Sequence, residues 1–461
     1  MVHVLTKTDR PHIDRYEKFR DFASRRAEKE VLESPTLLTG ESRRLHVRET
    51  MREDNVFRIQ NRPAGAHAKF DKLTSSLFKF FRGSALLFHR DIAGTDAHLP
   101  TVLCIGDIHP ENFGVMPNRD GAPLFGINDY DEAYFAPFSW DLKRGSVGFW
   151  IAGRENGFSK KKRRKVVAAF VGGYLDGLKH FAAGDREKSF QYRMDNSPEL
   201  IRDLLESAQE ARREFLSELI DLENGKFLAT DEVVPKASDV DKFQEVIDDY
   251  REENDIEEGS RAGHFKVKDV AIKKGSGTAS LGLDRYFVLI DGPTVDHADD
   301  LMLELKQTRR SALAGLVAAD VEGEQVYEEG EAERVVKSQQ VHLVGGDPYF
   351  GHVTIDDTSF LVKQRGPLKD DIDIDELSPS TMKEYAGICG KTLAAAHARS
   401  DEDSGIMEGD AEKRILSALN PEVFTGDIVR FTEEAARKLK RDYRAFCKDY
   451  ELGVFDVLGE A

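Results

Sequence analysis

The sequence predicts an α+β protein built from two lobes, and three observations lead to this prediction. At 461 residues the chain exceeds the size that one hydrophobic core usually serves, so more than one lobe is expected. Apolar residues recur at helical spacing through much of residues 1–225 and 375–461. Between these parts, residues 263–374 are typical of short strands separated by turn residues. We therefore expect a larger, mainly helical lobe into which a smaller β lobe is inserted.

The charge and the cysteines limit the classes of function. A net charge of −18 argues against non-specific binding to nucleic acid or to an anionic membrane. Cys104, Cys389 and Cys447 are scattered without metal-binding spacing, as expected of reduced thiols. The first residues, MVHVLTKTDR, lack an apolar signal core, and no apolar run approaches membrane-spanning length. We expect a cytoplasmic protein that binds neither nucleic acid nor membrane, and the oligomeric state stays open.

Residues 1–100 are predicted to form the N-terminal helical part of the larger lobe. The charged stretch IDRYEKFRDFASRRAEKEVLE reads as a helix that ends at Ser34-Pro35. A second stretch, KFDKLTSSLFKFFRGSALLFH, has apolar residues at helical spacing and contains Arg82. This arginine could contact a phosphate, although such residues more often bind a carboxylate or a helix end.

The segment 104–144 carries most of the polar residues that suggest chemistry. The buried-strand pattern TVLCIG is broken at Gly106-Asp107. Residues 113–116 and 124–127 are predicted to form a hairpin around a turn, so Asn112 and Asp129 should meet at its open end. Amide and carboxylate oxygens meeting at a loop end suit Mg²⁺, which leaves Asp107 free to act on a hydroxyl proton. The polar residues of the segment that suggest chemistry are Asp107, His109, Glu111, Asn112, Asp129, Asp131, Glu132 and Asp141.

Helices should complete residues 101–225. Helical patterns are found in two stretches, WDLKRGSVGFWIAGRENG and VVAAFVGGYLDGLKHF. The basic run 160–165 is expected to be the solvated start of the second helix. Residues 198–224 are predicted to form one long charged helix. Residues 226–262 are predicted to be an acidic connector or an exposed helix.

Residues 263–374 are predicted to be the small β lobe. The order is a strand, a glycine-rich turn, a strand, a loop and a third strand. A strand after the turn excludes a dinucleotide-binding turn, which needs a helix there. It favours a flap whose backbone covers nucleotide phosphates. The residues assigned to nucleotide contacts are Gly275, Ser276, Gly277 and Thr278 of the turn, with Gln364 near the end of the lobe.

The central motifs GDIHPEN, INDYDEA and SWDLKR resemble the catalytic and metal loops of aminoglycoside phosphotransferases and choline kinases. These enzymes belong to the protein-kinase-like fold, and their pattern is H-G-D-x-H-x-x-N followed by I-D-[FW]-[DE]. Here Ile105 replaces the first histidine, and residues 128–131 stand for the metal-binding turn. As a whole, the chain resembles the uncharacterised bacterial family known as domain of unknown function 2252.

The resemblance implies roles for the central residues. Asp107 would be the catalytic base, and Asn112 and Asp129, with Asp131, would hold Mg²⁺ or Mn²⁺. Asp141 would brace the catalytic loop from the following helix. His109 would support these residues without contacting the phosphates.

The resemblance also implies which lysine contacts the phosphates. Lys273 ends a V-A-I-K string that matches the kinase motif, but this string precedes the glycine-rich turn. In kinases the phosphate lysine lies on the third strand, which is the position of Lys306, so Lys273 is expected to be a surface residue. Glu331 or Glu333 of the next helix could pair with Lys306, or could lie on a solvated face.

The motif order implies a circular permutation. In known kinase-like enzymes the glycine-rich lobe comes first, whereas here the catalytic loop precedes it. We expect residues 1–225 and 375–461 to assemble the large lobe, with the helix at 385–400 ending beside segment 104–112. Chain termini that lie close together make such a rearrangement inexpensive.

The function expected from these residues is transfer of phosphate from Mg²⁺-ATP to a hydroxyl of a small molecule. Three alternatives stay open. The first is a metal-dependent hydrolase that uses Asp107, His109, Asp129 and Asp131 as ligands. The second is a catalytically silent nucleotide-binding protein. The third is a nucleotidyl transferase on the same fold.

Overall fold

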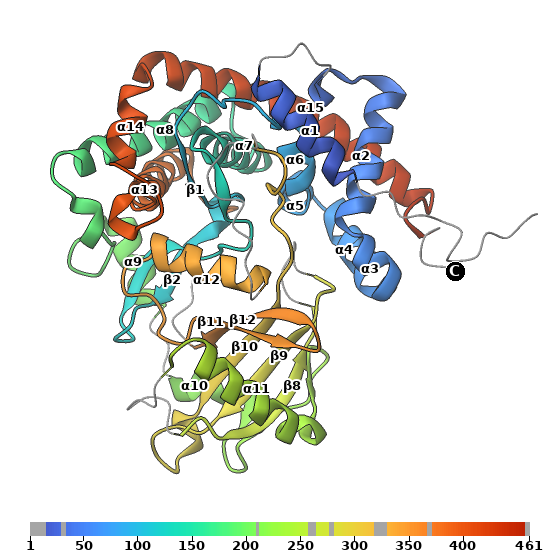
Figure 1. The fold of residues 1–461 in the computed structure, drawn as a ribbon, viewed down its shortest axis with the longest axis vertical. Coiled ribbons are helices and arrows are strands. Elements are labelled where there is room, and N and C mark those ends of the chain that lie inside the picture. Colours follow the sequence, from blue (N-terminus) through green and yellow to red (C-terminus); the bar gives the residue numbers. More distant parts are fainter. Residues whose placement is uncertain are drawn as a thin grey trace, which may run out of the picture.

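The computed structural model describes residues 15–28, 34–208, 212–256, 264–275, 281–317, 330–366 and 371–456 (Figure 1). It contains a sheet lobe, made of strands β7–β12 and helix α11, and a helical lobe built from both ends of the chain. The expected α+β class is confirmed. Ser276, Gly277 and Thr278, which were assigned to nucleotide contacts, lie outside the described residues.

The helical lobe begins with six helices. They are α1 (Tyr16–Ala27), α2 (Gly40–Asp54), α3 (Val56–Asn61), α4 (Pro63–Thr74), α5 (Leu77–Arg82) and α6 (Ala85–Ile92), with a 3-10 turn, η2, at Pro35–Leu37. Arg43 of α2 forms buried ion pairs with Asp91 and Asp442, both at 2.7 Å. Since Asp442 lies in the last helix, this pair of contacts joins the two ends of the chain.

The central segment forms two small antiparallel pairs. Strand β1 (Thr101–Cys104) pairs with β4 (Tyr134–Pro137), and β2 (Phe113–Pro117) pairs with β3 (Pro123–Ile127). A 3-10 turn, η3 (Pro110–Asn112), joins β1 to β2. The register pairs Phe113 with Ile127, and the Asn128 amide donates to the Asn112 carbonyl at 3.2 Å. The predicted hairpin is therefore confirmed, with Asn112 and Asn128 adjacent at its open end.

Three long helices surround this segment. They are α7 (Ser139–Glu155), α8 (Lys160–Ala182) and α13 (Pro379–Ala398). Helices α8 and α13 approach closely through glycines: a Cβ on Gly173 would lie 2.0 Å from the Gly387 carbonyl oxygen. A Cβ on Gly390 would lie 2.0 Å from the carbonyl oxygen of Phe170. The small residues of α13 thus allow the two helix backbones to pack closely.

The sheet lobe is one antiparallel sheet in the order β11-β12-β10-β9-β8-β7. Its strands are β7 (Val233–Pro235), β8 (Val267–Lys273), β9 (Arg285–Ile290), β10 (Leu301–Gln307), β11 (Gly351–Ile355) and β12 (Thr358–Arg365). Helix α12 (Glu331–His342) lies between the sheet and the helical lobe, as Figure 1 shows. Along β10, Leu303 and Leu305 face the core shared with α11, whereas Met302 faces the other side.

The expectation for residues 198–224 is wrong, and the one for residues 226–262 holds in part, since α11 is a helix with an exposed acidic face. Residues 198–224 do not form one helix: α9 (Glu199–Ser207) and α10 (Arg212–Ser217) are followed by a short hairpin, β5 (Ile220–Asp221) and β6 (Lys226–Phe227). Residues 226–262 are not simply a connector, because β7 joins the sheet and α11 (Val240–Glu253) buries Phe243 and Ile247 against it. The acidic residues lie on the outer face of α11. The remaining short turns are η4 (Arg186–Ser189), η5 (Ala237–Asp239) and η6 (His297–Asp299).

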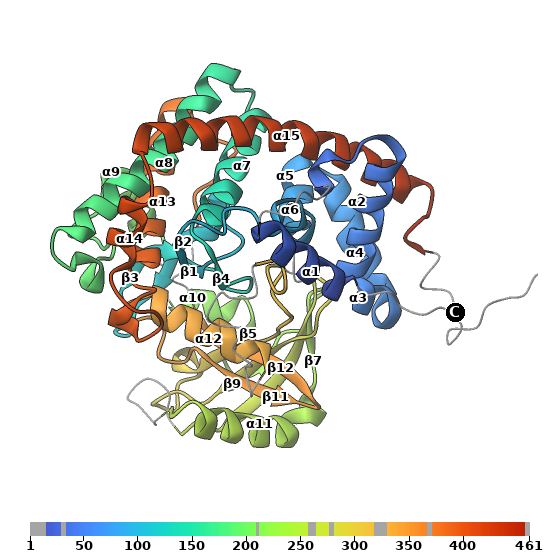
Figure 2. The ribbon, with the colours of Figure 1, turned by 45° about the horizontal axis from the view of Figure 1, so that its top comes forward.

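The last two helices are α14 (Ala411–Ser417) and α15 (Pro421–Glu451), and a 3-10 turn, η7 (Glu402–Ser404), precedes them. Helix α15 runs along α7 and α8 and reaches the N-terminal helices, as Figure 2 shows. At the start of α8, Lys160 and Arg164 pair with Glu433 of α15. None of the described helices is long and apolar enough to cross a membrane.

The glycine contacts predict opposite effects of two alanine substitutions. Gly390→Ala should lower the free energy of unfolding by roughly 1–3 kcal/mol, since its Cβ would meet a backbone carbonyl of α8. Gly172→Ala is the matched control because nothing lies within 4 Å of its Cβ position. It should raise the free energy by about 0.5–1 kcal/mol through helix propensity. Urea unfolding would measure both, and equal effects would contradict the packing described.

Candidate functional site

A pocket of about 480 Å³ lies between the sheet lobe and the β2–β3 hairpin of the helical lobe. It brings together residues that are far apart in the sequence. Its lining includes Arg82, Glu111, Asn112, Val115, Met116, Asn128, Asp129, Tyr130, Glu232, Lys273, Gly275, Arg285, Phe287, Glu304, Lys306, Phe350, Lys363, Gln364, Arg365 and Asp371. Asn112, Asp129, Lys306, Gly275 and Gln364, which the sequence assigns to metal or nucleotide, all line it.

The sheet wall of the pocket is basic. Lys306 of β10 is paired in register with Arg285 of β9, and Lys363 and Arg365 follow two residues apart on β12. Glu304 lies among these cations, 2.9 Å from Arg285 and 3.9 Å from Lys363. Burial alone would raise the pKa of Glu304, but the cations, Lys363 first, lower it to about 2. One buried carboxylate thus faces several positive groups, and the wall keeps a net positive charge.

The opposite wall carries the oxygens proposed as metal ligands. Asn112 is buried at the end of η3, and its Nδ2 donates to the Asp107 carbonyl at 2.6 Å. That bond turns the amide oxygen of Asn112 away from Asp107. Asp129 follows β3, and one of its carboxylate oxygens accepts from the Asp131 amide at 3.2 Å. Asp129 also lines the pocket. Hard oxygen donors on one wall and cations on the other suit a metal-bound phosphate between them.

Lys306 forms an ion pair with Asp131. The sequence had suggested Glu331 or Glu333 as its partner. Burial alone would lower the pKa of Lys306, but Asp131 and then Asp129 raise it. Burial likewise opposes ionisation of Asp131, and the Lys306 ammonium lowers the pKa of that carboxyl. The Asp131 carboxylate therefore holds the lysine and would have to leave it to bind a metal.

Glu331 and Glu333 of α12 are not the partners of Lys306. Glu331 pairs with Arg334 at 2.8 Å, and Glu333 pairs with Lys337. Instead, the guanidinium of Arg334 on α12 donates hydrogen bonds to the backbone carbonyls of Asp131 and Ala133, at 2.8 and 2.7 Å, in the turn that follows β3. Helix α12 thus contacts the turn directly.

Asp107 lies beside the pocket rather than in its lining. The Arg144 Nε donates to its Oδ1 at 2.9 Å, and Arg144 is itself fully buried against the ring of Phe81. Burial is the main cause that raises the pKa of Asp107 to about 6, and Arg144 opposes this rise. A carboxyl with a pKa near neutrality can accept a proton more readily than an ordinary aspartate.

His109 and Arg82 also lie near Asp107. Burial, and then Arg82, lower the pKa of His109 well below its ordinary value, so the ring is neutral. Its Nε2 lies 4.0 Å from an Asp107 oxygen. Arg82 pairs with Glu111, so the structure shows it bound to a carboxylate, the commoner of the two roles expected for it.

Lys273 is not the surface residue that its place in the sequence suggested. Its side chain lines the pocket and forms an ion pair with Glu232. Two lysines, Lys273 and Lys306, therefore share one site. Glu232 lies in the segment before β7, so the segment read as a connector contributes to the pocket.

Asp141 holds the loop that carries Asp107. Its two carboxylate oxygens accept from the amides of Ile105 and Gly106, at 2.7 and 2.8 Å. His397, near the end of α13, lies 3.0 Å from the same carboxylate. Asp141 thus supports the loop, as the resemblance to the phosphotransferases implies for this residue. Its contact with His397 also connects α13 to the loop.

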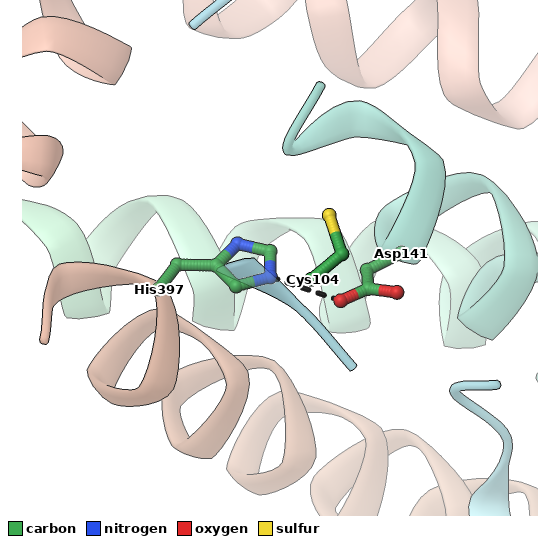
Figure 3. Close-up of side chains that lie close together, drawn as sticks. All are labelled: Cys104, Asp141 and His397. Atoms are coloured by element: carbon green, nitrogen blue, oxygen red, sulfur yellow. Dashed lines mark hydrogen bonds and ion pairs between the residues drawn. The ribbon is translucent and has the colours of Figure 1, made fainter. Parts of the chain in front are cut away.

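Cys104 lies next to Asp141 and His397, so the three resemble a metal-binding group (Figure 3). Their donors already have other partners, however. The His397 Nδ1 bonds the Tyr174 hydroxyl at 2.8 Å, and Asp141 holds two amides. Burial raises the pKa of the Cys104 thiol well above its ordinary value, which opposes the thiolate that a metal needs. We interpret this cluster as structural.

The chain matches, over residues 61–449, the family described as "Uncharacterized protein conserved in bacteria (DUF2252)". It belongs to this family. No curated protein and no solved structure matches the chain. The family description assigns no reaction, so the function has to be argued from the site.

Several site residues are missing from the sequence-based assignment. They are Arg144, Glu304, Arg285, Lys363 and Arg365. The strands carry the relevant signal, since Glu304 and Lys306, or Lys363 and Arg365, are two apart and share a face. Which face meets the pocket depends on how the lobes pack, and the alternation alone does not show this.

The hydrogen bonds of Asp141 predict the effect of a conservative change. Asp141→Asn would place an amide NH₂ against backbone N–H groups, and should lower the free energy of unfolding by roughly 3 kcal/mol. Hydrogen exchange of the Ile105 and Gly106 amides should speed up. Asp176→Asn, on the exposed face of α8, is the control and should change neither. Unchanged exchange in Asp141→Asn would contradict the bracing role.

Proposed function

We propose that this protein is a Mg²⁺- and ATP-dependent phosphotransferase that acts on a hydroxyl group of a small molecule. The observation that carries the proposal is the pocket itself. Asn112 and Asp129 face Lys306 and the other cations of the sheet across one space, although Lys306 follows Asp129 by 177 residues in the sequence. Phosphoryl transfer requires such an arrangement, because the metal and the cations act on the same phosphates.

The order of the elements supports a kinase-like fold. The proposed phosphate lysine, Lys306, is on β10. Counting from β8, this is the third strand of the lobe, and the glycine-rich turn of the sequence comes between the first two, β8 and β9. Helix α12 follows β10 and packs next to the metal-binding turn, and the antiparallel pair β11–β12 completes the lobe. These features resemble the small lobe of protein kinases.

The position of α13 supports the permutation. His397, near the end of this helix, contacts Asp141, which in turn holds Ile105 and Gly106. The C-terminal end of α13 therefore lies beside the start of the loop that it would precede in an unpermuted chain. The helical lobe is completed from both ends of the sequence, which a permutation requires.

Each residue can be assigned a part in the reaction. Asn112 and Asp129 would hold Mg²⁺, which would neutralise charge on the phosphates. Lys306, Arg285 and Lys273 would hold the phosphates against the sheet. Asp107 would accept the proton of the acceptor hydroxyl, with Arg144 fixing its orientation.

One observation favours a second candidate, a catalytically silent nucleotide-binding protein. Asp107 does not line the pocket and is already bound to the buried Arg144. If this pair stays closed when nucleotide binds, the site would bind without transferring phosphate. Measuring phosphate release from ATP, with water as the acceptor, distinguishes the two candidates. Release by the parent that is lost in Asp107→Asn supports the transferase. Absence of release by the parent supports the silent protein.

The metal ligands predict a metal-dependent effect of nucleotide. ATP should raise the melting temperature only when Mg²⁺ or Mn²⁺ is present, because the ligands on the helical lobe reach the phosphates through the metal. Asp129→Asn should abolish this shift while leaving the melting temperature without ligand nearly unchanged. Differential scanning fluorimetry with and without EDTA would measure both.

Asp120→Asn, at the exposed tip of the same hairpin, is the matched control and should respond to ATP like the parent. An equal shift in the presence of EDTA would contradict the proposed metal ligands.

The pKa of Asp107 predicts a pH profile. A base with a pKa of about 6 loses its accepting form as the pH falls, so the rate of phosphate release should drop tenfold per pH unit below about pH 6. Arg144 lowers the pKa of Asp107, so Arg144→Gln should move this limb to higher pH. Arg154→Gln, on the same helix, should leave it in place. A profile that is flat between pH 5 and 7 would be inconsistent with Asp107 as the base.

A further inference from the structure

The helical lobe concentrates positive charge along its outer helix α15, on the side away from the sheet lobe (Figures 1 and 2). We call this surface the basic face. Three elements contribute to it: the end of α7, the start of α8 and the second half of α15. The proposed phosphotransferase reaction uses none of its residues. They are Arg154, Lys160, Lys161, Lys162, Arg163, Arg164, Lys165, Arg437, Lys440, Arg441 and Arg444.

Contacts between the three helices bring these cations onto one surface. Glu433 of α15 forms ion pairs with Lys160, at 2.7 Å, and with Arg164, so the start of α8 lies against α15. A Cβ on Gly153 would lie 3.3 Å from the Cγ atom of Arg163, so the end of α7 lies against the start of α8. The basic run 160–165 is therefore not an isolated stretch of charge, because two other helices add cations beside it.

The positive charge of the basic face is largely unneutralised. Eleven basic residues stand beside three acidic ones, Glu155, Glu433 and Glu434. Of the eleven, Lys160 and Arg164 form ion pairs in the described part of the chain, and the other nine form none. A further acidic segment, 371–376, borders the face at the end of α7, where the Asn156 side chain donates to the Ile374 carbonyl at 2.6 Å. The charge of Arg154, followed by burial and the charge of Arg444, lowers the pKa of Lys440.

The start of α8 keeps its cations against a local preference. Residues 160–165 are six successive cations in the first turns of the helix, and its first turn contains no acidic residue. The N-terminal end of a helix carries a partial positive charge, so cations placed there destabilise the helix. Positions that break a local preference in this way are often functional ones. Anions, in contrast, are stabilised beside a helix N-terminus.

The surroundings of the basic face distinguish between anionic partners. Helix α15 buries Ile428, Leu439 and Phe446 in the core, so these side chains cannot insert into a membrane. Trp150 is 5% exposed and Tyr443 is half-buried, so neither offers an open ring on which unpaired bases could stack. Six of the eleven cations are arginines, which bind phosphate oxygens in a bidentate manner. These features favour a duplex, whose phosphates lie outside and whose bases are stacked inside.

We propose that the basic face binds double-stranded nucleic acid through its phosphate backbone, without reading the base sequence. The net charge of −18, on which the expectation against nucleic acid rests, is an average that conceals this local excess of cations. The acidic remainder of the surface repels phosphates, so the duplex is bound by the basic face in preference to other surfaces. The face lies away from the pocket, so a duplex and a nucleotide can be bound at the same time.

Fluorescence anisotropy with labelled 20-base-pair DNA and RNA duplexes tests the proposal on the full chain in EDTA. The parent should bind with a Kd of about 10⁻⁶ to 10⁻⁴ M at 150 mM salt, and more tightly as the salt is lowered. Two double variants, Lys161→Gln with Lys162→Gln and Arg441→Gln with Arg444→Gln, should each weaken binding at least tenfold. Each should also reduce the slope of log Kd against log salt by about two, because two phosphate contacts are lost. The duplex that binds more tightly identifies the class of nucleic acid.

The matched control is the double variant Lys18→Gln with Lys266→Gln, which changes the net charge equally at two exposed lysines outside the basic face. It should bind the duplexes like the parent, and so should Asp129→Asn, which separates this surface from the proposed active site. All the lysine and arginine variants should melt like the parent, since the substituted side chains are exposed.

Three results would overturn the proposal. The first is that the parent binds neither duplex at 50 mM salt. The second is that the control variant loses as much affinity as the variants of the basic face, which would make the effect one of net charge. The third is a preference for another partner, seen as tighter binding to a single strand of equal length. Binding to phosphatidylserine vesicles without binding to either duplex would show the same preference for another partner.

Discussion

The rest of the site depends on the hydrogen bonds made by the buried carboxylate of Asp141. It accepts hydrogen bonds from two successive amides of the Asp107 loop and contacts His397 at the end of α13. Three elements that are distant in sequence are thereby held by one side chain. Charge-assisted bonds of this kind are short and strong when water is excluded. The loop can therefore keep a fixed shape although it carries few regular hydrogen bonds of its own.

The pocket separates charges of opposite sign onto two lobes. The sheet supplies Lys306, Arg285 and Lys363, and the helical lobe supplies Asp129 and the amide of Asn112. Without a ligand, Lys306 and Asp131 neutralise each other across the gap. A phosphate with its metal would offer each partner a new counter-charge, so binding would exchange one ion pair for several. The energy gained would then depend on the metal as much as on the nucleotide.

The local parts of the site could be predicted from the sequence. The β2–β3 hairpin follows from its turn residues, and it brings the chain back so that Asn128 bonds Asn112. Three other features depend on how distant elements pack. Lys273 looked exposed on its own strand, but β7 and Glu232 lie beside it. Glu331 and Glu333 have the right charge to bind Lys306, yet Asp131 is the residue that reaches it. The acidic composition of 226–262 concealed the apolar face of α11, whose Phe243 and Ile247 recur at helical spacing.

The most direct test of the central claim is a crystal structure of the protein with Mg²⁺ and a non-hydrolysable ATP analogue. In this complex we expect Mg²⁺ bound to oxygens of Asn112 and Asp129 at about 2.0–2.1 Å, with the phosphates against Lys306 and Arg285. We also expect Lys306 to have moved from Asp131 toward the phosphates. A nucleotide bound outside this pocket, or phosphates whose metal contacts neither Asn112 nor Asp129, would contradict the account.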